Sequence, residues 1–297
     1  MESNLKKTGF LYCFAAVFFF STNELVGKFI GEGISPAMIT IVRFLIGFVI
    51  LLPFALRQKR KELLSLQWSD FLNISIPAVI NVVGAMLFLQ LAIYYGKAST
   101  SAILISSNPI FVVFLAALIL KEKISGCKLI GMFLGLAGIL LVIRGEIPSL
   151  TAGTESRIGL FFGILASFTF ALFTVLAKRE VKRYGNLLFN AVSFLTGAVA
   201  LLLVASLFNI DLHFTLSGRN IILILYLGVF VTVAAYILYF AGLKEIPAAT
   251  GSMLFFLKPF IASALSWIFL GERISFLQFL GIFLILGGIR LSQKQEA

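Results

Sequence analysis

The chain has 297 residues, of which 60% are apolar and 12% are charged, and its formal net charge is +11. A soluble domain of this size could not bury so large an apolar fraction, which excludes a water-soluble globule and predicts a membrane protein. The positive charges lie in short segments between apolar runs, so they indicate membrane orientation and not a nucleic-acid partner.

Ten apolar segments approach the roughly 20 residues that a helix needs to cross a bilayer. In chain order, we expect membrane helices at 9–30, 37–56, 71–94, 98–120, 127–143, 158–177, 187–208, 220–240, 248–270 and 277–291. The first segment is long enough to span and others follow it, so we expect it to be retained and not cleaved as a signal peptide. The sequence therefore predicts an all-α membrane protein with ten transmembrane helices and no soluble domain.

The Lys and Arg residues between these segments are unevenly distributed. Alternate connecting segments hold sixteen of them on one side of the predicted membrane and six on the other. Because cytoplasmic segments are richer in Lys and Arg, we expect both termini in the cytoplasm of a multi-pass protein of the cell membrane.

The second half of the chain repeats the first at a constant spacing of 150 residues. The aligned pairs include Gly9 and Gly159, Ala98 and Ala248, Pro109 and Pro259, Glu122 and Glu272, and Gly138 and Gly288. We place one five-helix repeat at 1–147 and the other at 154–297. Since five crossings are an odd number, the second repeat must enter from the opposite side, which predicts an inverted repeat and transport by alternating access.

Each half closes with a proline, an apolar stretch, a glutamate, an Ile-Ser pair and a final helix with spaced glycines. This pattern resembles the EamA-type members of the drug/metabolite transporter superfamily. It is carried by Arg43, Pro109, Glu122, Ser125, Gly131, Gly138, Pro259, Gly271, Glu272, Ser275, Gly281 and Gly288. The resemblance implies a ten-helix exporter of amino acids or other small metabolites, whose cavity lies between the first, third, fourth, sixth, eighth and ninth helices. The chain departs from the family at Lys121, where glycine is usual, and at Lys258, where an apolar or small polar residue is commoner.

Three charged residues fall inside the predicted membrane helices, where each costs at least about 2.5 kcal/mol unless it is paired or hydrated. Glu24 and Arg43 lie at nearly equal depth, so we expect a salt bridge between them. This pair could staple two helices together, or Glu24 could act as a gate or protonation site. Lys258 lies near the middle of its helix, either facing the cavity to attract a carboxylate or phosphate, or held in a fixed pair with Glu24.

Buried amides complete the predicted site, because they are costly in lipid unless they line water. The expected substrate-binding residues are Asn23, Glu24, Arg43, Asn81, Gln90, Asn108, Tyr239 and Lys258. The sequence holds one histidine, no paired-carboxylate or Cys-His cluster and no nucleotide-binding glycine loop. We therefore expect neither an enzyme nor a metal site, cofactor or direct coupling to ATP.

The sequence thus predicts a secondary active transporter that exports amino acids or similar small carboxylate-bearing metabolites. Its expected partners are the lipid bilayer and a small-molecule substrate, and no nucleic acid. Two alternatives are an efflux carrier for lipophilic compounds and an accessory membrane subunit that transports nothing. The spaced glycines of the fifth and tenth helices pack either within the chain or in a homodimer.

Overall fold

The computed structural model describes residues 2–96, 98–144, 154–261, 264–265 and 276–293. This part of the chain is helical apart from turns, loops and one isolated bridge between Ile34 and Phe214. Within it, seven helical stretches are long and apolar enough to cross a membrane, and shorter apolar helices cover 126–138 and 248–261. The all-α membrane fold predicted from the sequence is confirmed, because a spanning segment in lipid must satisfy its own backbone groups.

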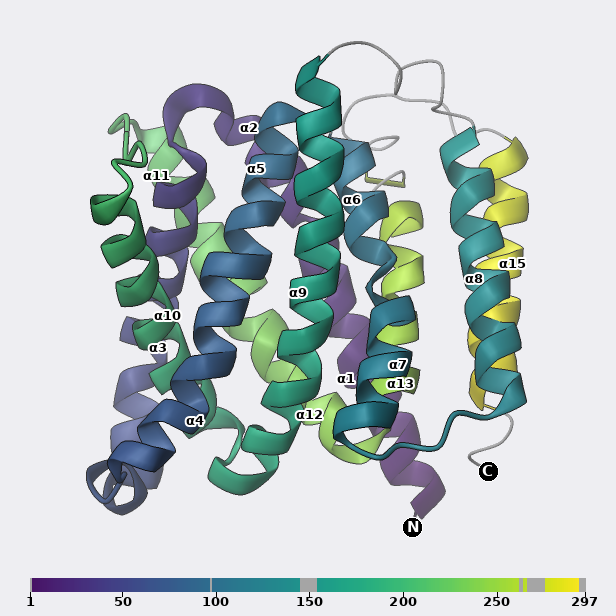
Figure 1. The fold of residues 1–297 in the computed structure, drawn as a ribbon, viewed down its shortest axis with the longest axis horizontal. Coiled ribbons are helices and arrows are strands. Elements are labelled where there is room, and N and C mark those ends of the chain that lie inside the picture. The colour runs from purple at the N-terminus through teal and green to yellow at the C-terminus, as the bar shows by residue number, and fades with distance from the viewer. Residues whose placement is uncertain (1, 97, 145–153, 262–263, 266–275, 294–297) are drawn as a thin grey trace.

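The helices of both halves run between two faces of the molecule (Figure 1). The first half contains α1 (Glu2–Ser21), α2 (Asn23–Ile30), the 3₁₀ turn η1 (Gly31–Gly33), α3 (Pro36–Leu64), α4 (Trp68–Val79), the π-helix η2 (Ile80–Met86), α5 (Leu87–Tyr95), α6 (Ala98–Ser106), α7 (Asn108–Ile119) and α8 (Gly126–Arg144). The second half contains α9 (Thr154–Tyr184), α10 (Asn186–Leu207), α11 (Gly218–Tyr226), the π-helix η4 (Leu227–Ala234), α12 (Ala235–Glu245), α13 (Ala248–Ser252), the 3₁₀ turn η5 (Met253–Leu257) and α15 (Phe276–Gln293).

We call the face at which α1 begins and α15 ends the terminal face, and the other the opposite face (Figure 1). The first helix of the second half, α9, begins at the opposite face, whereas α1 begins at the terminal face. The two halves therefore enter the molecule from opposite ends, as an inverted duplication requires.

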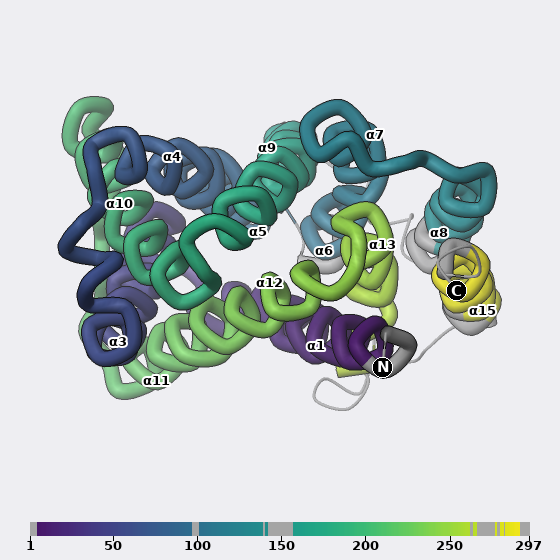
Figure 2. Tube along the Cα trace, turned by 90° about the horizontal axis from the view of Figure 1, so that it is seen from below, coloured from purple at the N-terminus to yellow at the C-terminus, as the bar shows by residue number. Residues whose placement is uncertain are grey.

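The two halves are interleaved and not side by side. The largest helix contacts pair α1 with α12, α3 with α10, α5 and α7 with α9, and α8 with α15. Each of these pairs joins a helix of the first half to one of the second. Figure 2 shows the pair α8 and α15 at one end of the molecule, with the remaining helices gathered in the larger bundle. The apolar core therefore lies between the halves.

Small residues allow these helices to approach closely, and the contacts come in pairs related by the repeat. A Cβ on Gly138 would lie 2.6 Å from the carbonyl oxygen of Gly281, and one on Gly288 would lie 2.5 Å from that of Gly131. The spaced glycines of α8 and α15 thus pack against each other within one chain, as close helix approach requires. The homodimer stays a prediction.

Helix interruptions fall in the interior of several spans. The chain breaks between α1 and α2 at Thr22, whose amide bonds to Phe19 at 3.1 Å, and between α6 and α7 at Ser107, just before Pro109. The π-helices η2 and η4 occupy nearly matching places in the two repeats. Interruptions of this kind are tolerated where they are buried in protein or line a cavity, and π-helices often mark functional sites.

Candidate functional site

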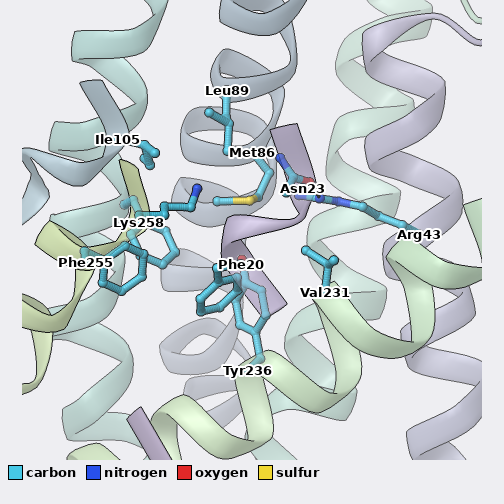
Figure 3. Close-up of a pocket in the computed structure, with 11 residues that line it drawn as sticks. Phe20, Asn23, Arg43, Met86, Leu89, Ile105, Val231, Tyr236, Phe255 and Lys258 are labelled. Atoms are coloured by element: carbon cyan, nitrogen blue, oxygen red, sulfur yellow. Dashed lines mark hydrogen bonds between the residues drawn. The ribbon is translucent and has the colours of Figure 1, made fainter. Parts of the chain in front are cut away.

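The interrupted helices surround a small buried cavity (Figure 3). Its lining residues are Phe20, Asn23, Arg43, Met86, Leu89, Ile105, Phe170, Val231, Tyr236, Phe255 and Lys258. They come from the first, second, third, fourth, sixth, eighth and ninth predicted helices, which are those implied by the resemblance together with the second. The cavity volume is about 20 Å³, and one water molecule needs roughly 10–15 Å³ on this scale. This conformation therefore closes around the site.

Arg43 brings an uncompensated positive charge to the cavity. Its side chain on α3 is 1% exposed, and its Nη1 donates to Oδ1 of Asn23 at 2.7 Å. The other edge of the guanidinium, formed by Nε and Nη2, has no hydrogen-bond partner among the described residues. Two parallel N–H groups on one edge match the two oxygens of a carboxylate. Arg43 therefore presents a ready site for one carboxylate.

The salt bridge expected between Glu24 and Arg43 is replaced by one between Glu24 and Lys258. Both side chains of this pair are 2% exposed, and Oε2 of Glu24 has no partner among the described residues. The sequence left both partners open for Glu24, because equal depth in the membrane does not fix which side of a helix faces which neighbour, and the structure pairs it with Lys258. Lys258 lies on the far side of the α1–α2 break from Arg43 (Figure 3).

The remaining predicted polar residues are buried around this centre without lining the cavity. The hydroxyl of Tyr236 donates to Oδ1 of Asn81 at 3.0 Å. Gln90 and Asn108 are 2% and 0% exposed, and their side-chain amide nitrogens have no partner among the described residues. Tyr239 is fully buried. These residues surround the centre, but in this conformation they do not reach the cavity itself.

Sequence reasoning missed the aromatic wall of the cavity. The ring of Phe20 stacks on that of Phe255 at 5.7 Å between centroids and meets those of Phe170 and Tyr236 edge to face. These rings are distributed over α1, α9, α12 and η5, so no sequence spacing could have grouped them. They supply an apolar surface beside the charged groups, as small-molecule sites commonly do.

The arrangement can bind a ligand but offers no evident route to covalent chemistry. Within the described residues, no group of three or more His, Cys, Asp and Glu side chains is placed to hold a metal ion. The charged groups at the cavity are two cations and one carboxylate, held by separate helices.

The two halves of the chain each match one family model, the EamA-like transporter family, over residues 7–144 and 157–292. The chain belongs to this family. It is accordingly a multi-pass membrane transporter, and ten helices are typical of such proteins. The motif residues Gly271, Glu272 and Ser275, which helped to suggest the family, lie outside the described residues.

Relatives support this assignment without naming a substrate. The chain is 32% identical to an uncharacterized transporter of Clostridium kluyveri, over 95% of this chain and 92% of the relative. It is 28% identical to the uncharacterized transporter YdfC of Bacillus subtilis, over 87% and 82%. It is also 26% identical to a WAT1-related chloroplastic protein of Arabidopsis thaliana, over 94% and 68%. The fold also matches the crystal structure of a protein that is 17% identical in sequence to this chain. The TM-score is 0.80, and the match covers 98% of this chain and 99% of the chain in that crystal structure.

Proposed function

We propose that this EamA-family transporter is a secondary active exporter of amino acids or similar small carboxylate-bearing metabolites, working by alternating access. The observation that carries the proposal is the buried guanidinium of Arg43, whose Nε and Nη2 have no partner within the described part of the chain and which lines the small cavity. A buried charge without a counterion is costly, and a bound carboxylate would remove that cost. The polar donors around it and the aromatic wall suit a small organic anion.

We further place the protein in the cell membrane with both termini in the cytoplasm. The support is the excess of Lys and Arg in the connecting segments of the terminal face, such as Arg57, Lys61 and Lys182. The positive-inside rule assigns this face to the cytoplasm. Export then means loading at the terminal face and release at the opposite face.

The test is counterflow in liposomes that contain the purified protein. We expect uptake of a labelled amino acid to be driven by the same unlabelled compound inside, and we expect the matching amino-acid amide, which lacks the carboxylate, to drive none. A panel of amino acids, short monocarboxylates and their amides would separate carboxylate recognition from recognition of the rest of the molecule. Equal counterflow of acids and amides would contradict the proposal.

Efflux of lipophilic compounds is the second candidate, and the rings of Phe20, Phe170 and Phe255 at the cavity favour it. The buried charges oppose a cationic compound, because Arg43 and Lys258 outnumber Glu24. Dye transport in the same liposomes, without counterflow of any carboxylate, would favour this candidate. Transport of neither class would indicate an accessory subunit.

A further inference from the structure

A network of charge-assisted hydrogen bonds ties the two halves together at the terminal face. The ammonium of Lys178 on α9 donates to Oε1 of Glu122 at 2.9 Å and to the carbonyl oxygen of Ile246 at 2.9 Å. Glu122 in turn accepts the backbone N–H groups of Ala248 at 2.9 Å and Ala249 at 3.3 Å. We call these five residues the latch. Glu122 belongs to the first half of the chain and the other four to the second.

The latch is built from groups that stabilise each other. The first amides of α13 have no partner within their own helix, and Glu122 satisfies two of them while its negative charge lies at the positive end of the helix. Burial raises the pKa of Glu122, but the charge of Lys178 and these hydrogen bonds outweigh it and lower the pKa below its ordinary value. Glu122 is therefore ionised at neutral pH, and its bonds are of the strong, charge-assisted kind.

The latch is connected to the cavity through a short stretch of chain. The segment whose amides it holds, α13, continues directly into η5 and then into Lys258. Phe255 and Lys258 of this stretch line the cavity. A movement of α13 away from Glu122 would thus shift cavity residues in the same step.

Part of the latch has a counterpart at the opposite face. Lys28 stands 150 residues before Lys178, and Gly96 stands 150 residues before Ile246. The ammonium of Lys28 donates to the carbonyl oxygen of Gly96 at 3.0 Å, as that of Lys178 does to the carbonyl oxygen of Ile246. The contact at the opposite face is exposed, whereas Lys178 and Glu122 are 21% and 16% exposed. The duplicated fold therefore repeats one lysine-to-carbonyl tie at both faces.

We propose that the latch is the gate of the carrier at the terminal face. Glu122 parts from Lys178 and from the amides of α13 when the cavity opens to that face, and it binds them again when the cavity opens to the opposite face. This inference rests on the alternating-access cycle of the proposed function. A cavity of about 20 Å³ cannot admit a metabolite without a separation of the halves, and the latch is an ionic tie across them at this face.

The first test measures which face the cavity opens to. A single reporter thiol, Val231→Cys in the cavity wall, would be placed in a background carrying Cys13→Ala and Cys127→Ala. A membrane-impermeant maleimide would be applied to vesicles that expose either the terminal or the opposite face. Glu122→Gln should raise labelling from the terminal face roughly tenfold and lower it from the opposite face, because the closed state loses its ionic tie.

The matched control is Glu62→Gln, which removes another carboxylate at the same face. Glu62 pairs with Lys59 of the same helix, α3, so this ion pair does not connect different helices. Labelling of the reporter thiol in Glu62→Gln should therefore equal labelling in the parent protein. Lys178→Gln removes the ammonium that pairs with Glu122. It allows the same labelling measurement if Glu122→Gln does not fold. Unchanged labelling in a folded latch variant would overturn the gate.

The second test closes the latch covalently. In the background without native cysteines, a reducible bifunctional thiol reagent would join Glu122→Cys to Lys178→Cys. Cross-linking should stop counterflow, and reduction of the cross-link should restore it in the same sample. If the cross-linked protein transports as fast as the same variant without the reagent, the proposal is overturned.

The two proposals fail separately, because labelling of the reporter needs no substrate. A labelling shift in a protein that moves no carboxylate would support the gate and refute the proposed substrate class. Carboxylate counterflow without a labelling shift would support the proposed function and refute the gate.

Discussion

Individual residues set the chemistry of the cavity, and the sequence predicted them better than it predicted their partners. Glu24, Arg43 and Lys258 stand out in the sequence because charges are rare in apolar helices, and all three are buried at one centre. The sequence offered two pairings for Glu24, with Arg43 or with Lys258, and could not choose between them, because the rise of a helix gives depth but not the direction in which a side chain points. The structure shows that Lys258 neutralises Glu24 and leaves Arg43 to Asn23.

The first prediction concerns Arg43. Arg43→Lys keeps the positive charge but removes the planar edge that can hold two carboxylate oxygens. We expect the KM for a carboxylate substrate to rise about tenfold or more, since a hydrogen bond to a charged group contributes about 1.5–3 kcal/mol. Counterflow kinetics would measure this, with the exposed Arg57→Lys on the same helix as the control. An unchanged KM would show that Arg43 does not contact the substrate.

Lys121, where the resembling family usually has glycine, adopts a backbone conformation that favours glycine. Its φ is +57°, a left-handed conformation that costs a residue with a side chain roughly 1–2 kcal/mol, and the amide of Glu122 bonds back to Ala116 at 3.2 Å. This turn ends α7 and directs Glu122 toward α13. Glycine, which is usual in the family here, would adopt it without strain.

We therefore expect Lys121→Gly to stabilise the protein by about 1 kcal/mol. Thermal unfolding in detergent would measure the change. Lys123→Gly, in the same connecting segment but without a positive φ, should give no gain. Equal effects of the two substitutions would assign the change to loss of charge and not to relief of strain.

At the scale of helices, hydropathy predicted nearly all of the spans but little of their internal form. The break at Ser107 has a cause in the sequence, because Pro109 lacks the amide that the helix would need. The π-helices η2 and η4 contain no proline, and they were not predicted from the sequence. Glu122 follows the predicted helix at 98–120, but the helix that it caps, α13, lies in the other half of the chain, so only the folded structure could identify it.

Adjacent glycines of α15 offer a test of helix packing. A Cβ on Gly288 would lie 2.5 Å from the carbonyl oxygen of Gly131, whereas one on Gly287 would have no atom within 4 Å. We expect Gly288→Ala to destabilise the protein by about 1–3 kcal/mol, as overpacking does. Gly287→Ala should be neutral or stabilising by up to about 1 kcal/mol, because alanine favours a helix. Thermal unfolding of both variants in one detergent would decide, and similar losses would contradict the packing described for α8 and α15.

The latch also makes the stability of the folded protein depend on pH through Glu122. The folded pKa of Glu122 is lowered, so its stabilising contribution is present above the unfolded value of about 4.3 and is lost as the pH falls through the folded value. The parent should therefore lose more stability than Glu122→Gln as the pH falls below about 4.3. Unfolding measured across this range would test it, and parallel curves for the two proteins would exclude Glu122 as the group concerned.

The whole molecule is organised by its duplication, which was evident in the sequence at a spacing of 150 residues. What the spacing did not reveal is that the halves interleave, because contacts such as α3 with α10 and α5 with α9 depend on the folded arrangement. The largest helix contacts join one half to the other, and the division of the chain into repeats at 1–147 and 154–297 stays a prediction. An opening at one face must therefore rearrange contacts between the halves.

Because the guanidinium of Arg43 has no carboxylate partner among the described residues, we expect the proposed cycle to be sensitive to voltage. With Lys258 neutralised by Glu24, the centre formed by the described residues carries one positive charge when empty, and a bound monocarboxylate without an amino group makes it neutral, whereas a zwitterionic amino acid leaves it positive. Reorientation of the empty protein would then move charge through the electric field, at up to about 2.3 kcal/mol per 100 mV, whereas reorientation of the protein loaded with such a monocarboxylate would not. For a monocarboxylate without an amino group, an imposed potassium-diffusion potential should alter net efflux, which includes the empty step, and leave one-for-one exchange unaffected.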